Sequence, residues 1–350
     1  MRLDRSITLN LVQPLRRLLA APKRSVGSSN APSLLTPTTL QHSTSPVPIL
    51  MYHSISDAPE PGVPAYYQTS TSLAVFRQHM EFLAQNGYKA VSLKTLVADL
   101  CAPFSPPTTP PLRHSTTPFP RLAAITFDDG FRNFYTEAFS VLQQHGFTAT
   151  MFLSTAFIGD TPRRFCPVGS QSKIKNQKSK IFLDCLKWTE VLELHRAGIE
   201  FGSHSVNHPR LVELDWPAVR SEICESKSEI EQRLGEGVTT FCYPYAFPQA
   251  DRQFAGRFAQ LLRETGYRCC ATTELGRVRP GDDPFRLKRL PANSLDDPAL
   301  FAAKLDGAYD WLGSIQSLSK KLRRLGRPLK ARPQVPAPDV GALAIPNRRL

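Results

Sequence analysis

Two short segments of the chain carry residues that could bind a metal ion and move a proton. The first is Thr126-Phe127-Asp128-Asp129-Gly130, and the second is His204-Ser205-Val206-Asn207-His208. Together they offer carboxylates and two imidazoles, which are the ligand types that Zn²⁺ and neighbouring first-row ions prefer. A second carboxylate could stay free to accept a proton. The two segments therefore predict metal-assisted hydrolysis.

The two aspartates are expected at the carboxyl end of a buried strand. An apolar run at 122–127, rich in strand-forming residues, precedes them, and a helical pattern at 133–145 follows and ends before Gly146. Neighbouring carboxylates repel each other in a dry cleft, and a bound cation removes that penalty. Because successive side chains of a strand diverge, we expect one aspartate to hold the metal and the other to act as a base.

The two histidines are expected in a loop. They follow a strand-like run at 199–202, and Pro209 comes directly after the second of them. Their i, i+4 spacing places both rings on one side in a helical turn, and a tight loop can do the same.

Strand-like and helical patterns alternate along the chain, which predicts an α/β fold with a parallel, closed or nearly closed barrel. The expected strands lie near 47–52, 89–92, 122–127, 147–154, 199–202, 238–243, 267–272 and 285–290. The expected helices lie near 72–86, 133–145, 188–197, 215–234 and 253–265.

These motifs, in this order, resemble those of the NodB-type polysaccharide deacetylases, carbohydrate esterase family 4. The strand 48–53, Pro-Ile-Leu-Met-Tyr-His, resembles the opening of the family branch with a Met-Tyr-His strand. A third motif at 241–245, Phe-Cys-Tyr-Pro-Tyr, resembles the family's Pro-aromatic segment. The resemblance covers roughly residues 46 to 303 and implies a distorted (β/α)7-type barrel.

The resemblance also implies a role for each matching residue. It makes Asp128 the general base and Asp129, His204 and His208 the ligands of a divalent metal, for which Zn²⁺ is the first choice and other first-row ions remain open. The backbone N–H of Tyr245 would stabilise the oxyanion that forms on the acetyl group.

One departure from the family pattern concerns the cation that steadies the base. Many members carry Arg two residues before the Pro of the third motif, but here Cys242 stands there. The segment 284–291 offers other cations, and we favour Arg289, which lies nearest the strand's carboxyl end. Arg286 and Lys288 would share the opposite face. A solvated basic face remains the alternative for Arg289.

A second departure concerns the general acid. The family's late Leu-x-His motif is absent, because no histidine follows His208. The leaving amine would then receive its proton from Asp128, from water or from an earlier histidine. His53 ends a predicted barrel strand and is a candidate, with a structural role as its alternative.

Outside the barrel the composition changes. We expect a basic, Ser/Thr/Pro-rich extension at 1–45, a deacetylase domain at 46–303 with insertions at 101–120 and 162–182, and a basic helix and tail at 304–350. The Pro-rich first insertion cannot form a regular helix or central strand.

Charge and cysteine content bear on partners and compartment. Lys and Arg number 43 against 30 Asp and Glu, and much of the resulting +13 comes from the C-terminal tail. The basic termini could contact a membrane surface, whereas we expect no nucleic-acid partner. Residues 1–45 contain no well-formed secretory signal, and no stretch has the roughly 20 apolar residues of a membrane span. Seven cysteines without metal spacing favour reduced thiols. We therefore expect a cytoplasmic protein or one peripheral to the inner membrane.

Three functions fit these observations. The first is a metal-dependent amidase that removes N-acetyl groups from amino sugars of a polysaccharide or its precursor, in exopolysaccharide or envelope metabolism. The second is an O-acetyl esterase or small-amide hydrolase on the same fold. The third is a carbohydrate-binding protein with a degenerate site, which the missing late histidine and the replacement at Cys242 would favour.

Overall fold

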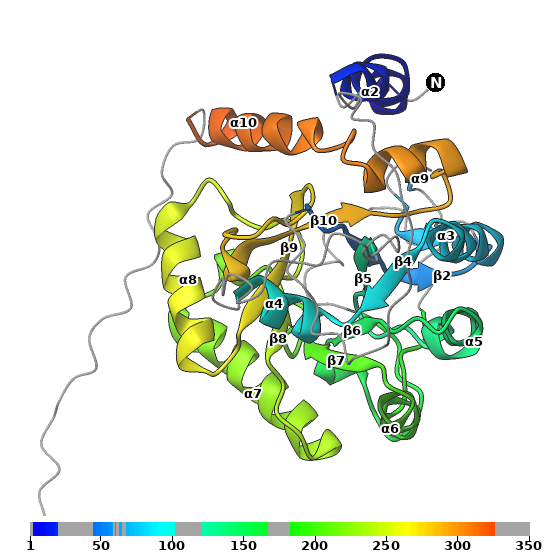
Figure 1. Cartoon of the computed structure of the whole chain (residues 1–350). Helices are drawn as coiled ribbons and strands as arrows, with labels where there is room; N and C mark the ends of the chain where they lie inside the picture. The colour runs from blue at the N-terminus through cyan, green and yellow to red at the C-terminus, as the bar shows by residue number, and fades with distance from the viewer. Residues whose placement is uncertain are drawn as a thin grey trace, which may run out of the picture.

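Seven parallel strands of the chain close into a barrel, and helices surround it (Figure 1). In this computed structural model the order around the ring is β1-β10-β9-β8-β7-β6-β5, and β5 pairs with β1 to close it. Strand β4 pairs with the first half of β5 and lies outside the ring. The predicted (β/α)7-type barrel is therefore confirmed.

The strands of the barrel sheet are three to seven residues long. They are β1 (Ile49–Tyr52), β4 (Tyr88–Val91), β5 (Arg121–Phe127), β6 (Thr150–Leu153), β7 (Glu200–Ser203), β8 (Thr240–Cys242), β9 (Cys269–Leu275) and β10 (Leu287–Pro291). Strands β2 (Ser54–Ile55) and β3 (Ser70–Thr71) form a separate pair.

Helices follow most of the strands. The α-helices are α1 (Leu3–Ile7), α2 (Gln13–Leu19), α3 (Leu73–Gln85), α4 (Leu93–Cys101), α5 (Phe139–Gln144), α6 (Trp188–Arg196), α7 (Trp216–Leu234), α8 (Arg252–Glu264), α9 (Pro298–Leu305) and α10 (Trp311–Leu325). The described residues also form two π-helical turns, η1 (Thr8–Val12) and η3 (Phe134–Ala138), and three 3₁₀ turns, η4 (Thr155–Phe157), η5 (Leu211–Glu213) and η6 (Pro284–Arg286).

The structure describes residues 3–19, 45–58, 60, 63–64, 68–101, 121–166 and 183–325. The expected insertion at 101–120 lies outside this part of the chain after residue 101. Residues 167–182 of the expected insertion at 162–182 also lie outside the described ranges. The same holds for residues 326–350 of the expected tail. Within the described residues, no helix is both long and apolar enough to cross a membrane.

The barrel interior is filled by an apolar cluster that is separate from the helix layer. Ile49, Ala124, Phe152 and Leu287 belong to it, and so do apolar residues of α4. Helix α4 was not predicted from the sequence. Its apolar residues join the barrel cluster rather than the helix-layer cluster, which places α4 against the barrel's interior.

Polar side chains tie the start of α4 to the strands. Glu200 of β7 accepts hydrogen bonds from the hydroxyls of Thr150 and Thr240, each at 2.9 Å. The same carboxylate accepts the backbone N–H of Lys94, and the Thr150 hydroxyl accepts that of Leu93. These bonds satisfy amide groups that the first turn of a helix leaves unpaired.

One strand boundary was predicted wrongly. The segment expected as a strand from 285 begins with the 3₁₀ turn η6, in which Asp283 accepts the N–H of Phe285. Arg286 therefore lies before β10 and pairs with Glu274 at 2.9 Å. Arg286 and Lys288 do not share a strand face, because only Lys288 belongs to the strand.

The N-terminal helices pack against α9 and α10, the last two helices of the described part of the chain. Arg5 forms an ion pair with Asp297 at 2.7 Å, and the indole of Trp311 donates a hydrogen bond to Thr8. Arg16 donates to the carbonyl of Gly307 at 2.8 Å. Segments from the two ends of the chain thus lie side by side on the outside of the barrel (Figure 1).

Gly202 on β7 has no side chain, and atoms of neighbouring core residues occupy the space where a Cβ would stand. A Cβ at Gly202 would lie 2.5 Å from the Thr240 hydroxyl and 2.6 Å from the Phe152 ring. We expect Gly202→Ala to lower the free energy of unfolding by about 1–3 kcal/mol, because overpacking forces the core to shift. The measurement is denaturant unfolding of the whole protein.

A matched control is Gly256→Ala. Gly256 lies within α8, and a Cβ there would meet no atom within 4 Å. We expect this variant to be neutral or more stable, since alanine favours a helix over glycine by about 0.5–1 kcal/mol. Equal stability of the two variants would contradict the packing argument.

Candidate metal centre and its carboxylate neighbour

The chain turns sharply after Asp128, and the turn separates the two aspartates. Asp129 has a φ of 75° and Gly130 has a φ of 73°, so both residues are left-handed. The positive φ of Gly130 favours glycine, and a Cβ there would lie 2.9 Å from the end of the Ile158 side chain, which would have to shift. Non-glycine residues in this region cost about 1–3 kcal/mol and are commonest at functional sites.

The turn brings Asp129 to the two histidines of the second motif. Its Oδ1 lies 3.5 Å from His204 Nε2 and 3.3 Å from His208 Nε2. Two ligands of one tetrahedral ion with bonds near 2.1 Å would be about 3.4 Å apart. All three side chains are buried. The three ligand atoms therefore lie at separations that fit a single metal ion.

The protonation of His204 also fits metal binding. Its Nδ1 lies 2.8 Å from the carbonyl oxygen of Cys242, which can only accept, so the proton sits on Nδ1 and the Nε2 lone pair is free. Burial lowers the pKa of His204 to about 4 and that of His208 to about 2. Both imidazoles are therefore neutral near pH 7, which is the form that binds metals.

Asp129 is held in surroundings that favour a cation. Burial raises its pKa well above the ordinary value, and the charge of Asp128 raises it further. Its Oδ1 has no hydrogen-bond partner among the described residues. A buried acceptor without a partner costs about 1–3 kcal/mol, and a metal ion would remove that cost.

Asp128 has a different partner, the guanidinium of Arg289. The two form a bidentate pair with distances of 2.7 and 2.8 Å, and Arg289 is 1% exposed. Burial alone would raise the pKa of Asp128, but the charge and hydrogen bonds of Arg289 outweigh it and hold the pKa well below its ordinary value. Asp128 is therefore an ionised carboxylate.

Other contacts fix Arg289 from several strands. Its Nε donates to the carbonyl of Thr272 at 2.9 Å, and its Nη1 donates to the hydroxyl of Thr126 at 3.2 Å. These contacts come from β9, which pairs with β10, and from β5, which lies beyond β1 on the other side of β10. Arg289 thus lies inside the barrel and is not part of a solvated basic face.

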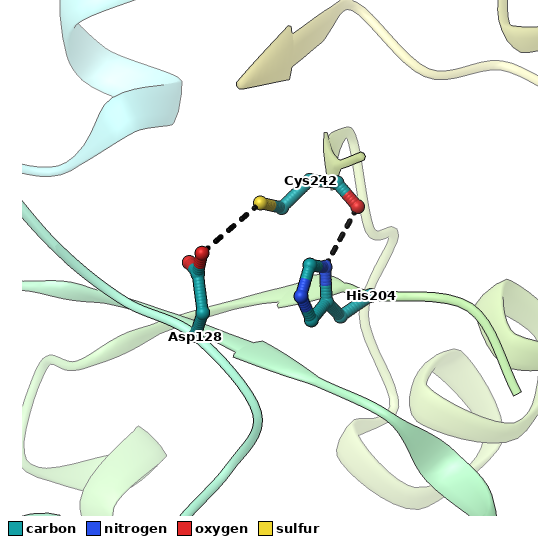
Figure 2. Close-up of side chains that lie close together, drawn as sticks. All are labelled: Asp128, His204 and Cys242. Carbon is teal, nitrogen blue, oxygen red and sulfur yellow. Dashed lines mark hydrogen bonds between the residues drawn. The ribbon is translucent and has the colours of Figure 1, made fainter. Parts of the chain in front are cut away.

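Cys242 lies between the candidate metal group, which is Asp129, His204 and His208, and the ion pair of Asp128 with Arg289. Its thiol lies 3.1 Å from Arg289 Nη2 and 3.6 Å from Asp128 Oδ2, while its carbonyl accepts the His204 bond (Figure 2). Burial raises the pKa of this thiol well above its usual value. The group is therefore a neutral thiol that can donate weakly to the carboxylate.

The remaining predicted site residues lie beside this centre. His53 Nε2 is 3.8 Å from Asp128 Oδ2, and the His53 side chain is 20% exposed. The Tyr245 ring lies 4.5 Å from the His208 ring, centre to centre, and Tyr245 has a φ of 57°. The structure thus brings together Asp128, Asp129, His204, His208, Tyr245, Arg289 and His53.

Sequence reasoning missed the residue that anchors the histidine loop. Glu222 of α7 accepts the backbone N–H groups of Val206 and Asn207 at 2.8 and 2.9 Å, and the Asn207 side chain at 2.8 Å. Between the histidines, Ser205 is left-handed, and its hydroxyl accepts the N–H of His208. As predicted, the segment is a loop rather than a helical turn.

Aromatic rings and a cation that the motifs did not indicate line the same region. The Phe165 ring lies 5.2 Å from the His208 ring, and the guanidinium of Arg210 lies 4.8 Å from the centre of the Tyr245 ring. Phe165 precedes the lysine-rich segment of the chain, whereas Arg210 follows Pro209. Neither has a local spacing signal that could have identified it.

Comparisons with known sequences find polysaccharide deacetylases. The family model described as polysaccharide deacetylase matches residues 116–270, which include both aspartates and both histidines. YxkH of Bacillus subtilis, itself assigned as a polysaccharide deacetylase by prediction, is 26% identical over 260 residues, or 74% of this chain and 76% of its own length.

Solved structures share the fold. A Streptococcus pyogenes deacetylase, PplD, solved with acetate, superposes with a TM-score of 0.57 at 21% identity, over 75% of this chain and 99% of that one. A de-N-acetylase from Aggregatibacter actinomycetemcomitans superposes with a TM-score of 0.56 at 18% identity, over 75% and 100% of the two chains. At these identities the likeness shows the fold alone.

The geometry predicts one metal ion per chain. We expect the purified wild-type protein to bind about one equivalent of Zn²⁺, and Asp129→Ala and His208→Ala to lose it, because each removes one of three ligands. The measurement is metal content after dialysis, together with the rise in melting temperature on adding Zn²⁺.

His195→Ala is the control, since His195 lies on α6 and faces Glu236 at 3.9 Å, away from the metal group. It should retain the metal. Stoichiometric metal in both ligand variants would contradict the assignment.

Proposed function

We propose that this chain, which belongs to the polysaccharide deacetylase family, uses a divalent metal ion to remove N-acetyl groups from amino sugars of a polysaccharide or its precursor. Membership of the family makes it a hydrolase of carbon–nitrogen bonds other than peptide bonds. The finer proposal concerns the metal, the N-acetyl substrate in exopolysaccharide or envelope metabolism, and the residue roles.

A single observation carries the proposal. Two adjacent carboxylates have different partners: Asp129 faces two neutral imidazoles, and Asp128 is clamped by Arg289. One carboxylate is therefore available to a metal while the other stays ionised beside it. A site that only bound carbohydrate would not require this buried arrangement of charges, which is costly unless every charge is paired.

The proposed roles follow from these contacts. Asp129, His204 and His208 hold the ion, for which Zn²⁺ suits the two nitrogen ligands and one oxygen ligand. When bound, such an ion acidifies a water molecule and polarises the carbonyl of the acetyl group. Asp128 takes the proton from the attacking water, and Arg289 keeps its carboxylate ionised and correctly oriented.

Two further groups are assigned from their positions. The backbone N–H of Tyr245 is proposed to donate to the oxyanion, and the left-handed conformation of Tyr245 sets the direction of that group. His53 is proposed to give a proton to the leaving amine, because its Nε2 lies 3.8 Å from Asp128 Oδ2. Burial lowers its pKa, so His53 is neutral before the reaction and would first have to receive the proton that Asp128 takes from the attacking water. Asp128 would itself serve as the acid if His53 is dispensable.

The relatives support the N-acetyl substrate. The Aggregatibacter actinomycetemcomitans structure is titled a de-N-acetylase, and the S. pyogenes deacetylase was solved with acetate, the product of such a reaction. We extend the same reaction class to this chain because its metal group and clamped aspartate could perform it.

The chemistry is tested by acetate release from N-acetylated chito-oligosaccharides. We expect Asp128→Asn to lower kcat by about 10²–10⁴-fold, as loss of a general base does. The same variant should keep its metal, because Asp129 and both histidines remain. Parallel assays on O-acetylated sugars separate an amidase from an esterase. Acetate release by Asp128→Asn at the wild-type rate would show that Asp128 is not the general base.

The clamp on Asp128 predicts a pH effect. Asp128 must be ionised to accept a proton, and Arg289 lowers its pKa. Lysine keeps the positive charge but cannot form the bidentate pair, so Arg289→Lys should raise the pKa of Asp128. We therefore expect the acid limb of the kcat/KM profile to move to higher pH and the maximum to fall by about tenfold or more.

Lys288→Ala is the matched control, because Lys288 is the preceding residue of β10 and pairs with Asp282 at 3.3 Å. Its profile should keep the wild-type acid limb. An acid limb that stays in place in Arg289→Lys would show that Asp128 does not titrate under the control of Arg289.

A further inference from the structure

Helix α10 lies against the barrel with its polar side. Gln316 accepts the N–H of Leu275 at 3.1 Å and donates to the carbonyl of Thr273 at 2.9 Å. Lys320, one turn further along, donates to the carbonyl of Phe247 at 2.9 Å. A cleft of about 660 Å³ lies between α10 and the segment after β9. Hydrogen bonds thus fix much of this helix, and Leu312 near its start packs against the core.

The opposite side of α10 is apolar and exposed. Ile315, Leu318 and Leu322 follow one another at spacings of three and four residues, which places them on one face. Their exposed fractions are 51%, 59% and 59%. A helix on a globular protein normally turns its apolar face to the core, so α10 is inverted.

The N-terminal helices add apolar side chains beside α10. Leu11 and Leu15 are 64% and 54% exposed, and Thr8 of the same segment bonds to Trp311 at the start of α10. Of the six large apolar side chains that are exposed among the described residues, five belong to these two segments; the sixth is Leu295. Figure 1 shows the two segments together at one edge of the molecule.

Charge selects the partner for this apolar surface. Helix α10 contains no acidic residue, and Lys321, Arg323 and Arg324 lie in its last turns. The N-terminal segment carries Arg16 and Arg17 on α2. A second copy of this chain would bring the same positive charges together, whereas an anionic bilayer would attract them.

We propose that α10 and the N-terminal helices form a docking surface for an anionic lipid bilayer, in which Ile315, Leu318, Leu322, Leu11 and Leu15 enter the boundary between headgroups and acyl chains. This surface is held to the loop that carries the proposed oxyanion donor: Lys320 bonds to Phe247, two residues after Tyr245. Docking would therefore place the site of hydrolysis beside the membrane. The proposal does not depend on the proposed chemistry.

The test is co-sedimentation of the full-length protein with vesicles of phosphatidylcholine alone or mixed with phosphatidylglycerol. We expect binding to the mixed vesicles that weakens as salt is added, because salt screens surface charge. Leu318→Ser combined with Leu322→Ser should lower the binding constant by at least about tenfold, since burial of a leucine contributes that much or more.

Leu295→Ser is the matched control, because Leu295 is exposed but lies in the segment before α9. It should bind vesicles as the wild type does. A second pair, Leu11→Ser with Leu15→Ser, tests the N-terminal helix independently and guards against misfolding of α10. Melting temperatures near that of the wild type would show that the variants are folded.

The proposal is overturned if the wild-type protein ignores the mixed vesicles, or if both leucine pairs bind them as tightly as it does. It is also overturned if the wild type is a dimer that the leucine pairs dissociate while vesicle binding is absent. Vesicle binding without acetate release would sustain this proposal and count against the proposed chemistry, so the two can fail separately.

Discussion

The site depends on the need to keep two adjacent, buried carboxylates in different surroundings. Side by side in a dry interior they would raise each other's pKa, and one would become protonated. The left-handed turn at Asp129 directs its carboxylate to the histidines, while Asp128 remains on the barrel interior beside Arg289. Arg289 holds the pKa of Asp128 low, whereas burial and the charge of Asp128 still raise the pKa of Asp129, which a cation beside it would offset. The strained backbone at Asp129 is thus what allows the two neighbouring carboxylates to have different partners.

The barrel supplies the rigidity that this division needs. Arg289 touches β5, β8 and β9 from its place on β10, so the clamp exists only when the ring is closed. The histidine loop is fixed separately, by Glu222 of α7. The two halves of the site are therefore held by different layers of the fold, and both layers must be in place for the proposed metal ligands and the proposed base to lie together.

The sequence predicted the barrel and the positions of the aspartate and histidine motifs, because strand alternation and motif order are local signals. The left-handed φ of Asp129 could not be predicted, since few non-glycine residues adopt it and its cause lies in contacts made by the whole fold. Strand periodicity separated the face of Arg289 from that of Lys288, but only ring closure shows which face is interior. Neither Glu222 nor the inverted face of α10 has a local signature.

The replacement at Cys242 can be understood from the space around Asp128. The Arg289 guanidinium already occupies both oxygens of that carboxylate, and the Cys242 sulfur lies 3.1 Å from Arg289 Nη2. An arginine at 242 would bring a second buried guanidinium against the first, with one carboxylate to neutralise both charges. A small neutral thiol fills the same place without that repulsion. Cys242 and Arg289 are therefore best regarded as one compensated solution for holding Asp128, in which the cation comes from β10 rather than from β8.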